Sequence, residues 1–125
     1  MTDWTASELD RIGAAYELTV APLGADGTLL APRPIWVVRD GDALYVRSFR
    51  GPAGAWYQVA SSSRSGYIRT GGVDKGVIFT PETDPAVNAW MDAAYRAKYG
   101  CYGGTYVDPL VGDDAHRTTL RLLPR

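Results

Sequence analysis

Basic and small polar residues are concentrated between residues 47 and 56. Arg47, Ser48, Arg50 and Gly51 follow closely on one another, and Trp56 ends the stretch. An arginine fork fits a phosphate group, a serine adds a hydroxyl, and a glycine lets backbone N–H groups approach an anion. These residue types favour an anion-binding site, whereas the alternative is a set of solvated charges beside a core tryptophan.

One basic residue and two aromatic residues could extend this site. Arg33 begins the apolar run that precedes the stretch, and a hairpin would place it near Arg50. Trp56 and Tyr57 could cover a planar ligand. The stretch and Arg33 together predict a pocket for a planar, anionic molecule.

A second group is rich in tyrosine and surrounds the end of a predicted helix. With Trp36, these residues could line a substrate pocket: Tyr95, Tyr99, Tyr102 and Tyr106. The favoured alternative is that Tyr95 and Tyr99 cover the barrel and that Lys98 caps the helix, since cations are favoured at helix C-termini.

Familiar catalytic motifs are missing. The chain contains no Gly-x-Ser-x-Gly, P-loop or His-Glu-x-x-His sequence. His116 is the only histidine and Cys101 the only cysteine, so we expect no metal site and assign His116 a structural or surface role. The spacing of Asp108, Asp113 and Asp114 matches no calcium loop, and we expect them to be solvated.

Composition narrows the class of protein. The 125 residues carry a net charge of −1 and 46% are hydrophobic, which predicts one globular domain, residues 1–125, and argues against nucleic-acid binding. The start of the chain lacks a basic, apolar leader, and no segment approaches a membrane span. We therefore expect a cytoplasmic protein.

The positions of the elements follow from residue patterns. Thr5 and Glu8 form a capping-box pattern before a helix over 6–14, and Asp84-Pro85 begins a longer helix over 85–99. Asp40-Gly41-Asp42 is typical of a turn joining strands 34–39 and 43–48. The remaining expectations are strand 16–22, short helix 55–60, a loop at 61–63, hairpin 67–70/76–80, irregular 102–114 and strand 118–123. This order predicts an α+β fold around a small antiparallel barrel.

Several segments resemble a bacterial family of uncharacterised proteins. The resemblance lies in Trp4-Thr5 with Glu8-Leu9, Pro34–Ser48, Ile68–Gly72, Ala93–Gly100 and Thr119–Leu122. That family is grouped with the FMN-binding split β-barrel superfamily, which includes pyridoxamine-phosphate oxidases and deazaflavin-dependent nitroreductases. The resemblance implies a split barrel of six or seven strands, and a homodimer with cofactor at the subunit interface.

The resemblance also suggests which residues would hold a cofactor. Deazaflavin relatives carry a serine–basic–glycine stretch and then a tryptophan, which Ser48, Arg50, Gly51 and Trp56 match here. Their basic segment before the second strand is replaced by residues 24–32, which contain no basic residue before Arg33. This departure removes phosphate contacts, and no catalytic acid or base carries over.

Three functions remain open from the sequence. The first is an oxidoreductase that uses FMN or a deazaflavin on a small organic substrate. The second is a barrel without cofactor that binds a small molecule and catalyses a proton transfer or cyclisation. The third is a non-enzymatic dimeric module. A bound flavin and no cofactor at all are equally compatible with the residues.

Overall fold

A computed structural model describes residues 3–125, so Met1 and Thr2 lie outside the described residues. It confirms the predicted α+β fold, with an N-terminal helix, a longer helix and a nearly closed antiparallel barrel. The strands are β1 Leu18–Pro22, β2 Arg33–Ile35, β3 Val37–Asp40, β4 Ala43–Val46, β5 Ser65–Thr70, β6 Val73–Pro81 and β7 Leu120–Pro124. The helices are α1 Ala6–Ala14, α2 Ala55–Ser63, α3 Pro85–Tyr99, α4 Gly104–Val107 and α5 Asp113–His116.

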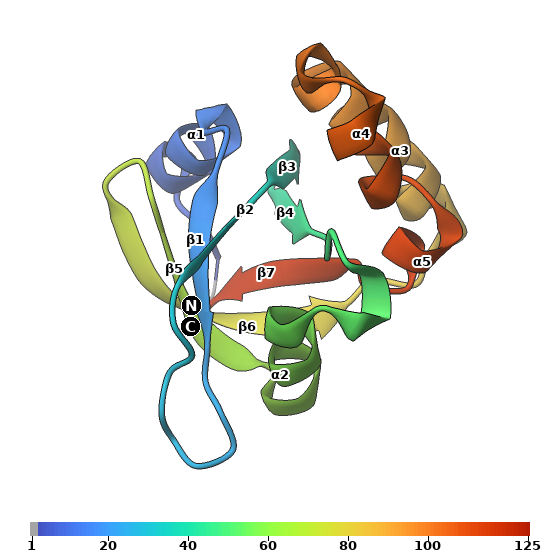
Figure 1. Ribbon diagram of the computed structural model, residues 1–125. Coiled ribbons are helices and arrows are strands. Elements are labelled where there is room, and N and C mark those ends of the chain that lie inside the picture. Colours follow the sequence, from blue (N-terminus) through green and yellow to red (C-terminus); the bar gives the residue numbers. More distant parts are fainter. Residues whose placement is uncertain (1–2) are drawn as a thin grey trace.

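The barrel is split between β2 and β3. The sheet order is β2-β1-β5-β6-β7-β4-β3, so these two strands form its edges, although only Trp36 separates them in the chain. β2 pairs with β1 and β3 pairs with β4. The prediction of one continuous strand over 34–39 is therefore wrong. The chain crosses from one edge of the sheet to the other at Trp36 (Figure 1).

The two predicted hairpins are present, with shifted ends. Gly41 turns between β3 and β4 at a φ of 56°, in the left-handed region that favours glycine. The β5–β6 turn contains only Gly71 and Gly72, and β6 already begins at Val73. The first strand also begins later than predicted, at Leu18 instead of residue 16.

The first helix begins as its sequence predicts. The Glu8 N–H donates to the Thr5 hydroxyl at 3.1 Å, while the Glu8 carboxylate accepts from the Thr5 N–H at 2.9 Å. Leu9 and Ile12 are buried against the barrel. The Trp4 Nε1–H donates to the Leu122 carbonyl at 2.9 Å, which ties the start of the helix to β7.

Two segments contain more helix than the sequence suggested. Residues 61–63, predicted as a loop, are the last turn of α2, which ends at Arg64 in a left-handed conformation. Residues 102–114, predicted as irregular, form 3₁₀ turns at 100–102 and 108–110 with α4 between them and the start of α5 after them. With α3 they make a helical layer beside the β4 side of the barrel (Figure 1).

Two hydrophobic clusters hold these parts together. The larger one fills the barrel and includes Val20, Val46, Phe79 and Leu122. The smaller one lies under α3 and includes Val38, Tyr45, Met91, Tyr95 and Tyr99. None of the helices within residues 3–125 has the length and apolar character needed to cross a membrane.

Candidate functional site

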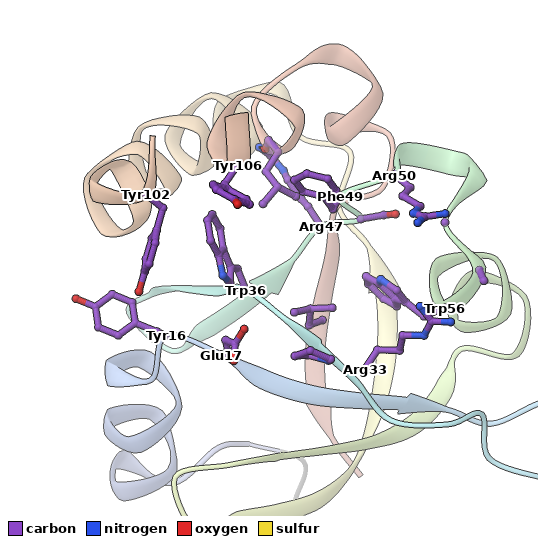
Figure 2. Close-up of a pocket in the computed structure, with 16 residues that line it drawn as sticks. Tyr16, Glu17, Arg33, Trp36, Arg47, Phe49, Arg50, Trp56, Tyr102 and Tyr106 are labelled. Atoms are coloured by element: carbon purple, nitrogen blue, oxygen red, sulfur yellow. The ribbon is translucent and has the colours of Figure 1, made fainter. Parts of the chain in front are cut away.

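A cleft of about 770 Å³ opens where the barrel is split (Figure 2). One wall comes from β2 and the residues before β1, and the opposite wall comes from the segment after β4 and from the helical turns after α3. The residues predicted for the site that line it are Arg33, Trp36, Arg47, Ser48, Arg50, Trp56, Tyr102 and Tyr106. Members of both predicted groups therefore meet in one cleft.

One end of the cleft carries two free arginines. Arg33 and Arg50 are exposed, and neither forms an ion pair with another residue in the described part of the chain. Arg33 reaches this end from β2, which pairs with β1. The prediction that a hairpin would place Arg33 near Arg50 was therefore based on the wrong strand pairing. Figure 2 shows both arginines on the same side of the cleft as Trp56.

The N-terminus of α2 opens at this same end. Gly54 is its N-cap and provides no capping side chain, and the first helical hydrogen bond runs from the Gln58 N–H to the Gly54 carbonyl at 3.0 Å. The N–H groups of Ala55, Trp56 and Tyr57 precede that bond and have no partner within the helix. Such a helix end attracts anions through its free N–H groups and its dipole.

Ser48 lies against this helix end with its hydroxyl unused. The residue is 1% exposed, and its Oγ has no hydrogen-bond partner within residues 3–125. A Cβ on Gly54 would collide with that Oγ, so the hydroxyl packs into the space that the glycine leaves. A buried hydroxyl without a partner lowers stability, which makes this position one where a ligand atom would supply the missing bond.

Arg47, predicted as an anion ligand, has a different role. Its guanidinium is fully buried and donates to the Asp92 carboxylate at 2.6 Å, the Leu110 carbonyl at 2.7 Å, the Asn88 side-chain oxygen at 2.9 Å and the Thr119 hydroxyl at 2.9 Å. These bonds join β4 to α3, to the 3₁₀ turn 108–110 and to the segment before β7. They occupy the guanidinium, so Arg47 contributes to the cleft floor and has no fork free for a phosphate.

His116 belongs to the same network. Its Nε2 lies 2.8 Å from Asp92 Oδ2 and 2.9 Å from Asp92 Oδ1, the oxygen that also accepts from Arg47. Asp92 thus links α3 to both β4 and α5. His116 is outside the cleft lining, which agrees with a structural position.

The other end of the cleft is aromatic. The Trp36 ring stacks on Tyr99 with centroids 3.9 Å apart and an interplanar angle of 2°, and Tyr102 lies 5.5 Å from Trp36. Tyr16 stands nearly perpendicular to Tyr102 at 6.1 Å. The Tyr16, Tyr102 and Tyr106 side chains are about half exposed, so their rings face open space.

Tyr95 and Tyr99, predicted for the substrate pocket, are fully buried and do not line the cleft. Burial raises the pKa of both phenols, so neither is suited to donate a proton near neutral pH. Tyr99 instead supports Trp36 from behind. Its hydroxyl donates to the Tyr16 carbonyl at 2.6 Å and accepts from the Val37 N–H at 3.1 Å.

The sequence suggested that Lys98 caps its own helix, but the structure shows that it does not. Its ammonium donates to the Gly13 carbonyl at 3.0 Å and the Val37 carbonyl at 2.7 Å, linking α3 to α1 and β3. Burial lowers the pKa of Lys98 from 10.5 to about 8. Lys98 is absent from the cleft lining.

Gly51 faces a smaller hollow of about 440 Å³ behind the arginine end, where Asp108, Asp113 and Asp114 also lie. Within residues 3–125, no group of three histidine, cysteine or acidic residues is arranged to hold a metal ion. Gly51 has a φ of 64°, in the left-handed region that favours glycine, so this residue permits the turn after Arg50.

Sequence reasoning missed Tyr16, Glu17 and Phe49, which also line the cleft. Tyr16 and Glu17 were assigned to the first strand, where alternation would place Tyr16 in the core. They lie before that strand begins, so assigning them to the strand concealed their place in the cleft. Phe49 is half exposed between Ser48 and Arg50, and no pattern in the sequence marks it as a residue of the cleft.

The chain belongs to the family described as an uncharacterized protein conserved in bacteria (DUF2255), whose model matches residues 8–122. A comparison with curated proteins finds no match. The fold is similar to that of conserved hypothetical protein Rv2991 from Mycobacterium tuberculosis, with a TM-score of 0.58 and 13% identity over 98% of this chain and 80% of that one.

Two further solved structures are similar. One is a FAD-binding protein from Mesorhizobium loti, with a TM-score of 0.56 and 14% identity over 97% of this chain and 88% of that one. The other is an F420 reductase, with a TM-score of 0.53 and 14% identity over 93% and 90%. At these identities the similarity shows a shared fold, and this fold agrees with the split-barrel superfamily that the sequence resembles.

Proposed function

We propose that this protein is an oxidoreductase that binds a flavin or deazaflavin in the cleft and acts on a small organic substrate. The observation that carries the proposal is the unpartnered Ser48 hydroxyl beside the open N-terminus of α2. Arg33 and Arg50 stand at the same end of the cleft. This combination of hydroxyl, backbone N–H groups and guanidinium forks suits a phosphate.

The residues present fit such a cofactor. The Ser48 Oγ packs into the space that Gly54 leaves, and no group within residues 3–125 supplies the partner that it needs. Ser48, Arg33, Arg50 and the first N–H groups of α2 would hold the phosphate, and Trp56 would flank the chain or ring beside it. A bound flavin-type ring supplies hydride chemistry, while the protein supplies position and exclusion of water.

The loop that carries basic residues in deazaflavin relatives does not contribute here. Residues 24–32 project from the barrel between β1 and β2 and contain no basic side chain (Figure 1). The charge for a phosphate comes instead from Arg33, at the start of β2, and from Arg50, after β4. The proposed site therefore relies on two arginines from opposite walls of the cleft.

The cofactor-free alternative makes a different demand on the same residues. It would be favoured by an apolar cleft from which Arg33 and Arg50 face away. Both arginines line the cleft, which supports the cofactor proposal. The FAD-binding and F420-reductase names of two proteins with this fold also favour a flavin-type ligand.

Absorbance and titration test the proposal. We expect the purified protein to bind FMN or a deazaflavin saturably at one site per chain. The change in ligand fluorescence measures this binding. Arg50→Met should weaken binding at least tenfold, because one charged contact to phosphate is lost. Arg69→Met removes an exposed arginine on β5, outside the cleft, and should bind as the unmodified protein does. Saturable binding of neither cofactor would exclude the proposal.

A further inference from the structure

The aromatic end of the cleft contains one carboxylate. Glu17 lines the cleft together with Tyr16, Trp36 and Tyr102. β1 and β2 pair through Leu18 and Ile35, so Glu17 stands opposite Trp36 one step beyond that pair. Figure 2 shows these four side chains together at the end of the cleft away from Arg33 and Trp56.

No positive side chain neutralises this carboxylate. Among residues 3–125 the Glu17 side chain takes part in no ion pair and no hydrogen bond, and only its backbone carbonyl accepts a bond, from Thr70. Lys98, near the end of α3, already donates to the carbonyls of Gly13 and Val37. Arg33 lies three strand positions from Trp36, about 10 Å along β2.

The rings beside Glu17 stand at different angles to one another, steep between Tyr16 and Tyr102 but only 37° between Trp36 and Tyr102. Tyr16 and Tyr102 meet at 84° with centroids 6.1 Å apart, and both rings are about half exposed. Trp36 lies 5.5 Å from Tyr102 and is fixed from behind by its stack on Tyr99. Aromatic faces at such angles beside a carboxylate form the kind of cage that binds organic ammonium ions, because the ring faces carry negative charge.

We propose that the Tyr16, Trp36, Tyr102 and Glu17 end of the cleft is a binding site for the ammonium group of an organic amine. A metal ion would need several oxygen ligands, which this end lacks, whereas a methylated ammonium gains contact with every ring. As a substrate site it rests on the proposed function, because the amine would then lie in the same cleft as the cofactor ring. As a binding site it depends on the cage alone.

The test uses choline and its neutral isostere 3,3-dimethylbutan-1-ol, titrated separately into the full chain by calorimetry or by ligand-observed NMR. We expect choline to bind at least tenfold more tightly than the neutral alcohol. Glu17→Gln should reduce choline affinity at least fivefold and leave binding of the alcohol unchanged. Asp42→Asn removes an exposed carboxylate from the β3–β4 turn and serves as the matched control, with no expected effect.

Equal affinity for the two ligands, no binding of choline, or unchanged choline binding in Glu17→Gln would each overturn the ammonium site. Glu17 is exposed, so its amide variant should unfold at the same denaturant concentration as the unmodified protein. Titration of the same samples with FMN and with a deazaflavin separates the two proposals. Choline discrimination without cofactor binding rejects the proposed function alone, and cofactor binding without discrimination rejects the amine site alone.

Discussion

Arg47 is the single side chain that joins most parts of the structure around the cleft. Its buried guanidinium bonds to residues of α3, of the 3₁₀ turn 108–110 and of the segment before β7. We expect Arg47→Met to lower the free energy of unfolding by about 3 kcal/mol or more, because the substitution leaves Asp92 and several buried acceptors without their donor. Chemical denaturation measures the change.

Arg33→Met is the control for this prediction. Arg33 is exposed and forms no ion pair within the described residues, so its loss should change the free energy of unfolding by less than about 0.5 kcal/mol. Equal small effects of the two substitutions would show that the Arg47 network does not stabilise the fold.

Ser48 and Gly54 should behave as a coupled pair. Gly54→Ala is expected to destabilise the protein by about 1–3 kcal/mol, since its Cβ would collide with the Ser48 hydroxyl. Ser48→Ala alone should be neutral or stabilising, because it removes a buried hydroxyl that has no partner. The double variant should recover most of the loss, and a double-mutant cycle of unfolding free energies measures this coupling. Additive effects would contradict the proposed contact.

The lowered pKa of Lys98 makes the free energy of unfolding depend on pH in a direction that can be stated. Burial lowers its pKa to about 8 in the folded protein from 10.5. The unfolded chain therefore binds more protons between these values, and the free energy of unfolding should rise with pH from about 8 upward. Comparison with Lys98→Met between pH 8 and 9.5, below ordinary tyrosine ionisation near pH 10, isolates this contribution. A difference between the two proteins that stays constant across this range would contradict it.

Residue types located part of the site without assigning every role. Arg33, Ser48, Arg50 and Trp56 were predicted from their chemistry, and they line one cleft. Arg47 has the same chemistry as Arg50, yet its position directly after β4 directs it beneath α3, where it is buried. Only the packing of distant segments distinguishes these two arginines, and no local pattern records that packing.

Among the elements, the joint between β2 and β3 depends most on α3. Tyr99 holds this joint through its stack on Trp36 and through hydroxyl bonds to Tyr16 and Val37. Tyr99→Phe keeps the stack and removes the bonds, which should lower the free energy of unfolding by about 1–3 kcal/mol. Tyr102→Phe alters an exposed hydroxyl near the same cluster and should change it little. Equal effects in thermal or chemical unfolding would contradict the role of the Tyr99 hydroxyl.

Local sequence patterns correctly predicted the elements whose formation depends on local sequence alone. The capping box of α1, the Asp84-Pro85 start of α3 and the β3–β4 turn are all confirmed. The break at Trp36 was missed because residues 34–39 read as one apolar run, and only pairing with β1 on one side and β4 on the other divides it. The helical turns over 102–114 were missed because glycine and tyrosine have low helix propensity and packing against α3 decides their conformation.

At the scale of the whole molecule, the split in the barrel creates the cleft and gives its ends opposite character. β2 runs along the cleft, with Arg33 at its first residue and Trp36 just beyond its last. The two ends thus lie about 10 Å apart on one strand. This arrangement suits a ligand pair in which an anionic cofactor tail and a cationic substrate group occupy separate ends.

The phosphate at the Ser48 end is the central claim, and a paired titration tests it most directly. The affinity of FMN should be compared with that of riboflavin, and that of a phosphorylated deazaflavin with its form lacking phosphate. The structure predicts at least tenfold tighter binding of the phosphorylated member in one of the pairs, with the difference lost in Arg50→Met. Equal affinity within both pairs would contradict the assignment of this end of the cleft to a phosphate.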